Sequence, residues 1–128
     1  MGAKHLPYEA AGGTMGIVKR NAITYEDIQV NGMVKVKKAN VIGPPEGWPE
    51  HTLRAVRIGP GGYTTYHNHD WEHVNYIIKG KAQLTIGEAT HELAEGDYAY
   101  VPPNVPHQFK NPCEHDLEFI CIVPQRGA

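Results

Sequence analysis

Several features are scarce in this chain of 128 residues, and each absence argues against a particular class of protein. Only two cysteines occur, Cys113 and Cys121, with no Cys-x-x-Cys pair, so we expect a cytoplasmic protein without a disulfide framework. No apolar run reaches the roughly eighteen residues of a membrane span, and the first residues lack the apolar stretch of a signal peptide. Twelve basic and fourteen acidic residues give a net charge of −2, which favours neither nucleic acid nor an anionic membrane as a partner.

Long helical patterns are also missing. Gly and Pro separate short β-like segments, and only the stretch 23–30 stays ambiguous, because Thr24 could cap a short helical turn. Many short strands predict an all-β protein, an antiparallel double-sheet barrel of the jelly-roll type. We expect a mobile N-terminal arm over 1–16 and a single domain over 17–128. The expected strands are 33–42, 53–58, 63–69, 73–78, 81–86, 90–93, 98–101, 107–109 and 117–123, with a loop at 43–49 and a turn at 59–62.

Histidine, in contrast, is concentrated. His67, His69 and His73 fall within seven residues, and His107 follows in a Pro-rich hairpin. Histidines two apart on an extended strand point to the same side, and imidazole is the commonest protein ligand for first-row transition metals. This density predicts a metal site rather than a set of surface histidines. The other histidines are expected at the surface: His5, His51, His91 and His115.

The residues around the first three histidines resemble the first motif of the cupin superfamily. That motif reads Gly, five residues, His-x-His, three or four residues, Glu, six residues, Gly. Gly61, His67, His69 and Gly80 stand in the matching places. The departure is His73, which stands where the motif usually carries a metal-binding Glu.

The second cupin motif reads Gly, five residues, Pro-x-Gly, two residues, His, three residues, Asn. Gly96, Pro102, His107 and Asn111 match it, fifteen residues after the first motif ends. Asn104 replaces the second turn glycine, and Asn is among the few residues that accept a positive φ. Two motifs in the right order make the resemblance specific, and it covers about residues 53–124.

The stretch 67–80, together with 119–124, is similar to the small four-histidine cupins that bind manganese. The resemblance implies one divalent ion held by His67, His69, His73 and His107, and Mn²⁺ is the ion we expect. Iron, nickel, copper and zinc stay open, because ligand type does not choose among them. Glu72, next to His73, is either an outward carboxylate or a partner that orients a ligand imidazole.

Strand alternation places further side chains. If His73 is a ligand, Asn75 shares its inward face, and Val74, Tyr76 and Ile78 form an apolar outer face that a second sheet or a partner must cover. This face, the open edges of such a barrel and the resemblance to dimeric small cupins predict a homodimer.

The last strand is apolar on both faces, so alternation alone does not orient it. The resemblance implies that Phe119 and Cys121 line the pocket, and it places Arg54 at the pocket mouth, although an outward, solvated Arg54 stays open. Tyr98 and Tyr100 share one strand face and could lie in the core or in the pocket; we expect the core.

The resemblance implies a metal-dependent enzyme that oxidises a small oxygenated substrate with O₂ or peroxide. Two alternatives stay open, because one fold hosts many activities. One is a non-oxidative isomerase or lyase acting on a sugar or organic acid, which would need a general base that the sequence does not identify. The other is a module that binds a metal or small ligand without turnover.

Overall fold

The computed structural model describes residues 16–128, and their regular structure is almost entirely antiparallel β-strand. No helix among these residues is long and apolar enough to cross a membrane. The expected arm over 1–16 lies outside the described residues except for Gly16. Within residues 16–128, three 3-10 turns occur, at Arg20–Ala22, Pro44–Glu46 and Gln125–Gly127. The strands are β1 (Glu26–Asp27), β2 (Val34–Ile42), β3 (His51–Tyr63), β4 (His73–Lys79), β5 (Lys81–Ile86), β6 (Ala89–Ala94), β7 (Tyr98–Val101), β8 (His107–Lys110) and β9 (Leu117–Pro124).

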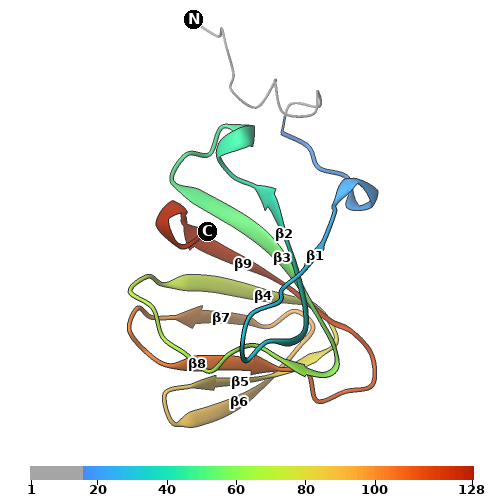
Figure 1. Cartoon of the computed structure of the whole chain (residues 1–128), viewed down its shortest axis with the longest axis vertical. Helices are drawn as coiled ribbons and strands as arrows, with labels where there is room; N and C mark the ends of the chain where they lie inside the picture. Colours follow the sequence, from blue (N-terminus) through green and yellow to red (C-terminus); the bar gives the residue numbers. More distant parts are fainter. Residues whose placement is uncertain (1–15) are drawn as a thin grey trace, which may run out of the picture.

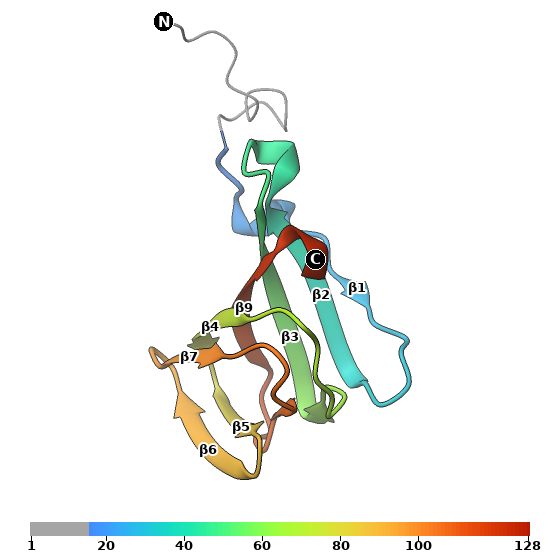
Figure 2. The ribbon, with the colours of Figure 1, turned by 90° about the vertical axis from the view of Figure 1, so that its left-hand side faces the viewer.

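The strands form one curled sheet in the order β6-β5-β8-β3-β9-β4-β7, with β2 paired to β3 and β1 paired to β2. The long strand β3 pairs with β9 along its first part and meets β8 only at Tyr63↔Lys110. Figure 1 shows β5, β6 and β8 at the end of the molecule opposite the 3-10 turn Pro44–Glu46, and in Figure 2 β5 and β6 lie on the other side of β3 and β9 from β1 and β2. The sheet therefore closes most of the way into an antiparallel barrel, which confirms the predicted fold class.

Inward and outward side chains alternate as the strand patterns predict. In β4 the residues His73, Asn75 and Ile77 are buried, whereas Val74 and Ile78 are exposed. The same alternation in β9 buries Phe119, Cys121 and Val123 inside the barrel. The core is built largely from branched aliphatic side chains, each of which stabilises the fold by about 1.5–3 kcal/mol when fully buried. Those with almost no exposed surface are Val56, Ile58, Ile77, Leu84, Val101, Leu117 and Val123.

Two predicted segments are wrong, both next to the histidine cluster. The expected turn at 59–62 is an irregular stretch within β3, because β2 pairs with β3 on both sides of it, at Val36↔Ile58 and at Val34↔Tyr63. Gly62 permits this, since a Cβ there would collide with the backbone oxygen of Val34. The expected strand 63–69 ends at Tyr63, and the chain then runs irregularly to β4.

The expectation of a core position for Tyr98 and Tyr100 is also wrong, since both are mostly exposed. The pairing of β7 with β4 explains why. Val101 pairs with His73 and Ala99 with Asn75, so the two small residues face inward beside the polar ones, and the tyrosines face out. The ambiguous stretch 23–30 contains no α-helix; it contributes the two-residue strand β1.

Candidate metal centre

His67 and His69 lie on the irregular segment between β3 and β4, and the start of β8 holds this segment in place. His67 forms an isolated antiparallel bridge with His107: the His107 N–H donates to the His67 oxygen at 2.9 Å, and the His67 N–H donates to the His107 oxygen at 3.2 Å. The Thr64 hydroxyl accepts the Phe109 N–H at 2.9 Å. The two histidine motifs are thus joined through their backbones.

The second hairpin supplies a further link. Asn104 adopts φ +65°, as expected for a residue in the place of a turn glycine, and its N–H donates to the His69 oxygen at 2.7 Å. Asn111, the last residue of the second motif, is buried; its amide donates to the Ile58 and His115 oxygens and accepts the Cys113 N–H. Asn111 therefore stabilises the turn after β8 and does not face the histidines.

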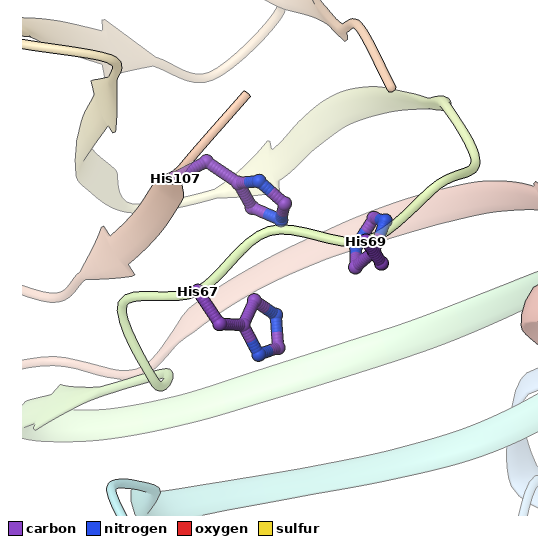
Figure 3. A group of neighbouring side chains, drawn as sticks. All are labelled: His67, His69 and His107. Carbon is purple, nitrogen blue, oxygen red and sulfur yellow. The ribbon is translucent and has the colours of Figure 1, made fainter. Parts of the chain in front are cut away.

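The rings of His67, His69 and His107 point toward one common space (Figure 3), and each offers a nitrogen within 4.8 Å of the others. His73 reaches the same space from β4: its Nε2 is 3.2 Å from Nε2 of His107, and its ring centroid is 5.5 Å from that of His69. His73 thus lies beside His107 and His69, although it is not one of the three histidines whose nitrogens all lie within 4.8 Å of one another. The group of three could hold a metal ion.

The outer nitrogens of three rings have defined partners. Nδ1 of His69 lies 2.8 Å from the Trp71 oxygen, and Nδ1 of His107 lies 2.9 Å from the Val105 oxygen. Nδ1 of His73 lies 2.7 Å from Oδ1 of Asn75, whose amide nitrogen donates to the Ile120 oxygen. Carbonyl oxygens only accept hydrogen bonds, so each Nδ1 must carry the proton, and each neutral ring turns an unprotonated Nε2 toward the shared space.

These tautomers make the 3.2 Å approach of the His73 and His107 Nε2 atoms repulsive, since neither atom holds a hydrogen to donate. A cation between them removes the conflict. Two nitrogens bound at about 2.1 Å to one ion, at angles of about 90–110°, lie about 3.0–3.4 Å apart. The observed separation falls in this interval, so the histidines fit a transition metal.

Burial keeps these imidazoles neutral. It lowers the pKa of His73 and of His107 from 6.5 to about 4, and it also lowers the pKa of His67 and His69. Neighbouring positive charge acts in the same direction, since Arg54 and Lys38 each lower the pKa of His73. Neutral imidazole is the form that binds metal, so the unliganded site is already in its binding state near neutral pH.

A narrow cavity of about 60 Å³ adjoins His67, His73 and His107. The four residues predicted to line the pocket all border it: Arg54, Asn75, Phe119 and Cys121. The outward alternative for Arg54 is therefore wrong. Glu72 is half-buried and is not among the Nδ1 partners of the described rings, so its orienting role stays a prediction.

Sequence reasoning missed Lys38, which borders the same cavity from β2. Its pairing with Val56, a buried residue of the β3 inner face, turns it inward. The signal was present in the alternation of β2, since Lys38 lies two residues after the inward Val36.

The described histidines outside the motifs do not join the site, and His5 lies outside the described residues. His91 and His115 are exposed, as predicted, while His51 is half-buried and stacks on Trp48 at a centroid distance of 5.2 Å. Trp71 does reach the site, because its ring stacks on His69 at 4.2 Å with an interplanar angle of 6°.

Comparison with known proteins agrees with the motifs and the barrel. The family model described as Cupin domain matches residues 54–123, more than half of the chain. The chain belongs to the cupin family. The likeness is also structural: the polyketide cyclase RemF from Streptomyces resistomycificus superposes with a TM-score of 0.77 at 26% identity, over 84% of this chain and 78% of that one.

Curated relatives are similar over shorter stretches. The chain is 35% identical over 71 residues to the 1-methylthio-D-xylulose 5-phosphate methylsulfurylase of Rhodospirillum rubrum, covering 56% of this chain and 46% of that protein. It is 35% identical over 61 residues to the H2HPP isomerase of Bacillus subtilis, covering 47% of this chain and 25% of that protein. The chain thus spans less than half the length of either relative.

Proposed function

We propose that this cupin binds one Mn²⁺ ion through His67, His69, His73 and His107 and uses it to oxidise a small oxygenated organic molecule with O₂ or peroxide. The observation that carries the proposal is the pair of unprotonated Nε2 atoms of His73 and His107, which face each other at 3.2 Å and call for a cation between them.

The donor set supports a redox or Lewis-acid metal rather than a structural one. Four neutral imidazoles leave a divalent ion its full charge, and a six-coordinate ion would keep two positions for substrate or oxidant. Zinc is more often satisfied by four protein ligands in a closed site. Iron, nickel and copper would compete for these ligands, so metal supply as well as geometry decides occupancy.

When bound, the metal would supply electron transfer and polarise an oxygen of the substrate. The protein residues around it bind and orient the reactants. Val56, Phe109 and Phe119 give the cavity an apolar wall that limits water, and Asn75 fixes the orientation of His73. The described lining contains no Asp, Glu or Tyr, but it includes Lys38 and Cys121, which can also transfer protons. Isomerisation therefore stays the alternative to oxidation.

The relatives support a small-molecule substrate, since the names of the polyketide cyclase, the methylsulfurylase and the isomerase all denote chemistry on small molecules.

We also propose a cytoplasmic homodimer. Both cysteines are free, which supports a reducing compartment. The exposed apolar side chains Val74, Ile78, Tyr98 and Tyr100 share the outer face of β4 and β7, a face that a second copy would cover.

The ligand set is tested by metal analysis of two neighbouring variants. His73→Ala should lose most of its bound manganese after equilibration in a limiting chelator, whereas Glu72→Ala should keep most of it. If the His73 variant kept its full manganese content, Glu72 would replace His73 as the proposed ligand.

Turnover is tested by measuring the consumption of oxygen and of peroxide with diketones, catechols, alkenes and keto acids as substrates. Isomerisation of a keto acid or sugar without oxidant consumption would contradict the oxidative proposal.

A further inference from the structure

Lys38 and Arg54 occupy one wall of the cavity. They come from the paired strands β2 and β3, where Lys38 pairs with Val56 and Asn40 with Arg54, so both face the barrel interior. Both also border a larger neighbouring hollow of about 450 Å³ that is lined by Glu26, Ile28 and residues of β2. The two cations therefore stand between the candidate metal centre and the outer hollow.

Neither cation has a carboxylate partner within the described residues 16–128. The Arg54 side chain donates one hydrogen bond among the described residues, from Nη2 to the Cys121 sulfur at 3.7 Å, and its Nε is buried without a hydrogen-bond partner. Arg57 on the opposite face of β3 differs, since it lies 3.4 Å from a Glu118 oxygen and 4.3 Å above the Tyr25 ring. On β3, the outward Arg57 therefore has a carboxylate partner, whereas the inward Arg54 has none among the described residues.

The charge around the cavity is consequently unbalanced. The described lining holds Lys38 and Arg54 but no Asp or Glu, and the imidazoles are neutral. Burial, followed by the charge of Arg54, lowers the pKa of Lys38, which is the response of a cation held near another cation. A divalent metal would add to the same excess. Uncompensated charge in a poorly hydrated site is costly, so the site favours an anion.

We propose that Lys38 and Arg54 bind the carboxylate of a small organic acid, with an adjacent keto or hydroxyl oxygen directed at the four histidines. This rests on the proposed function for the role of the second oxygen, but the carboxylate contact depends only on residues of the chain. A planar carboxylate matches the planar fork of a single arginine. The narrow cavity, walled by the stacked rings of Phe109 and Phe119, also suits a small planar group.

Glu26 is the acidic residue that faces this region from β1, where it pairs with Lys38. It is exposed and forms no ion pair with Lys38 or Arg54 among the described residues, so it does not neutralise them. Because it borders the outer hollow, its charge should repel an arriving carboxylate. Removal of that charge should strengthen binding, the opposite of what removal of either cation should do.

Calorimetric titration with pyruvate and with pyruvamide, its neutral amide of the same size, tests the proposal in metal-free and manganese-loaded protein. Pyruvate should bind at least about tenfold more tightly than pyruvamide in both forms. Lys38→Met and Arg54→Gln should each reduce this preference by about tenfold, and Glu26→Gln should increase it by about twofold to threefold. Lys37→Met, the same change on the exposed face of the same strand, should leave it unaltered.

Equal binding of the two probes, absence of pyruvate binding at low-millimolar concentration, or an unchanged preference in Arg54→Gln would overturn the proposal. Tighter binding of inorganic phosphate than of pyruvate would overturn the carboxylate assignment. Metal analysis of the same samples separates this inference from the proposed function. If the wild-type protein prefers pyruvate but binds no manganese, the proposed anion site stands and the proposed metal centre is wrong. The gain in Glu26→Gln cannot be produced by misfolding.

Discussion

Gly127 lies directly against the indole of Trp71, with no room for a Cβ between them. The same indole reaches the metal centre, since the Trp71 ring stacks on His69 at 4.2 Å. Arg126 adds a hydrogen bond from Nη2 to the Asp70 oxygen at 3.1 Å. The 3-10 turn Gln125–Gly127 therefore fixes the segment that carries His69, although it is far from it in sequence.

Gly127→Ala should consequently weaken metal binding without any change to a ligand. The added methyl group must displace Trp71, and His69 would lose the surface that holds its ring. We expect manganese affinity to fall by about tenfold, in line with the effect of residues that orient metal ligands. A competition titration with a chelator would measure it. Gly59→Ala is the matched control, because a Cβ there meets Lys35 at 3.4 Å, within ordinary contact. Equal affinities in the two variants would contradict the role of the contact.

Asn75 is predicted to act through its acceptor oxygen. Asn75→Leu should lower manganese affinity by about 10–100-fold, because His73 would lose the partner that keeps the proton on Nδ1. Asn75→Asp retains an acceptor in the same place and should keep most of the affinity. If the Asp variant binds manganese as poorly as the Leu variant, Asn75 acts through packing rather than through its hydrogen bond. Thermal unfolding of both variants would show that the fold is intact.

The metal-free protein should lose stability as the pH falls from about 6.5 to about 4. In this range an unfolded histidine takes up a proton, whereas His73 and His107 resist protonation because burial lowers their pKa to about 4. The unfolded state then binds more protons, so the free energy of unfolding decreases with falling pH. Thermal unfolding in a chelator would measure the slope. A His73→Gln, His107→Gln double variant should show a shallower slope, and an unchanged slope would contradict the assignment.

Much of the barrel could be predicted from the sequence, because its strands alternate regularly and Gly or Pro marks most of the turns. β5 and β7 have the predicted bounds. The two wrong segments share a cause: residues 59–62 and 64–72 take their conformation from distant strands. Strand β2 pairs with β3 on both sides of residues 59–62, and His107 and Asn104 form hydrogen bonds to residues 64–72. Local composition does not contain these contacts.

Motif spacing and strand alternation predicted part of the candidate site. The motifs supplied the four histidines as expected ligands and alternation placed Asn75 inward, whereas Phe119 and Cys121 came from the family resemblance, because alternation does not orient the last strand. The tautomers of the rings could not be predicted, because the partners of His69 and His107 are backbone carbonyls, which carry no mark in the sequence. The contact of Trp71 with Gly127 is likewise visible only in the three-dimensional structure.

The outer face of β4 and β7 should mediate dimerisation. Val74 pairs with Tyr100, and Tyr76 lies 4.7 Å from Tyr98 between ring centroids, so the exposed apolar groups are contiguous across the two strands. The wild-type protein should be a dimer at micromolar concentration by light scattering, and Val74→Lys with Tyr100→Lys should shift it to monomer. Val30→Lys, at an exposed apolar residue elsewhere, should leave the dimer intact. A monomeric wild-type protein would overturn the prediction.

The two thiols should differ in their chemistry because only one of them borders the cavity. Cys113 is half-buried in the turn after β8, so a bulky thiol reagent should label it first. Cys121 is 5% exposed and contacts Arg54 inside the barrel, where such a reagent does not reach but peroxide can. Peroxide oxidises a thiol to the sulfenic acid as it is itself reduced to water, and a nearby redox metal accelerates thiol oxidation. Peptide mass mapping after peroxide treatment should therefore show faster oxidation of Cys121 in the manganese-loaded protein than in the metal-free protein, with Cys113 oxidised equally in both. Since Cys121 borders the cavity, equal oxidation of Cys121 in the two forms would mean that the bound metal does not activate peroxide, and would count against the oxidative function.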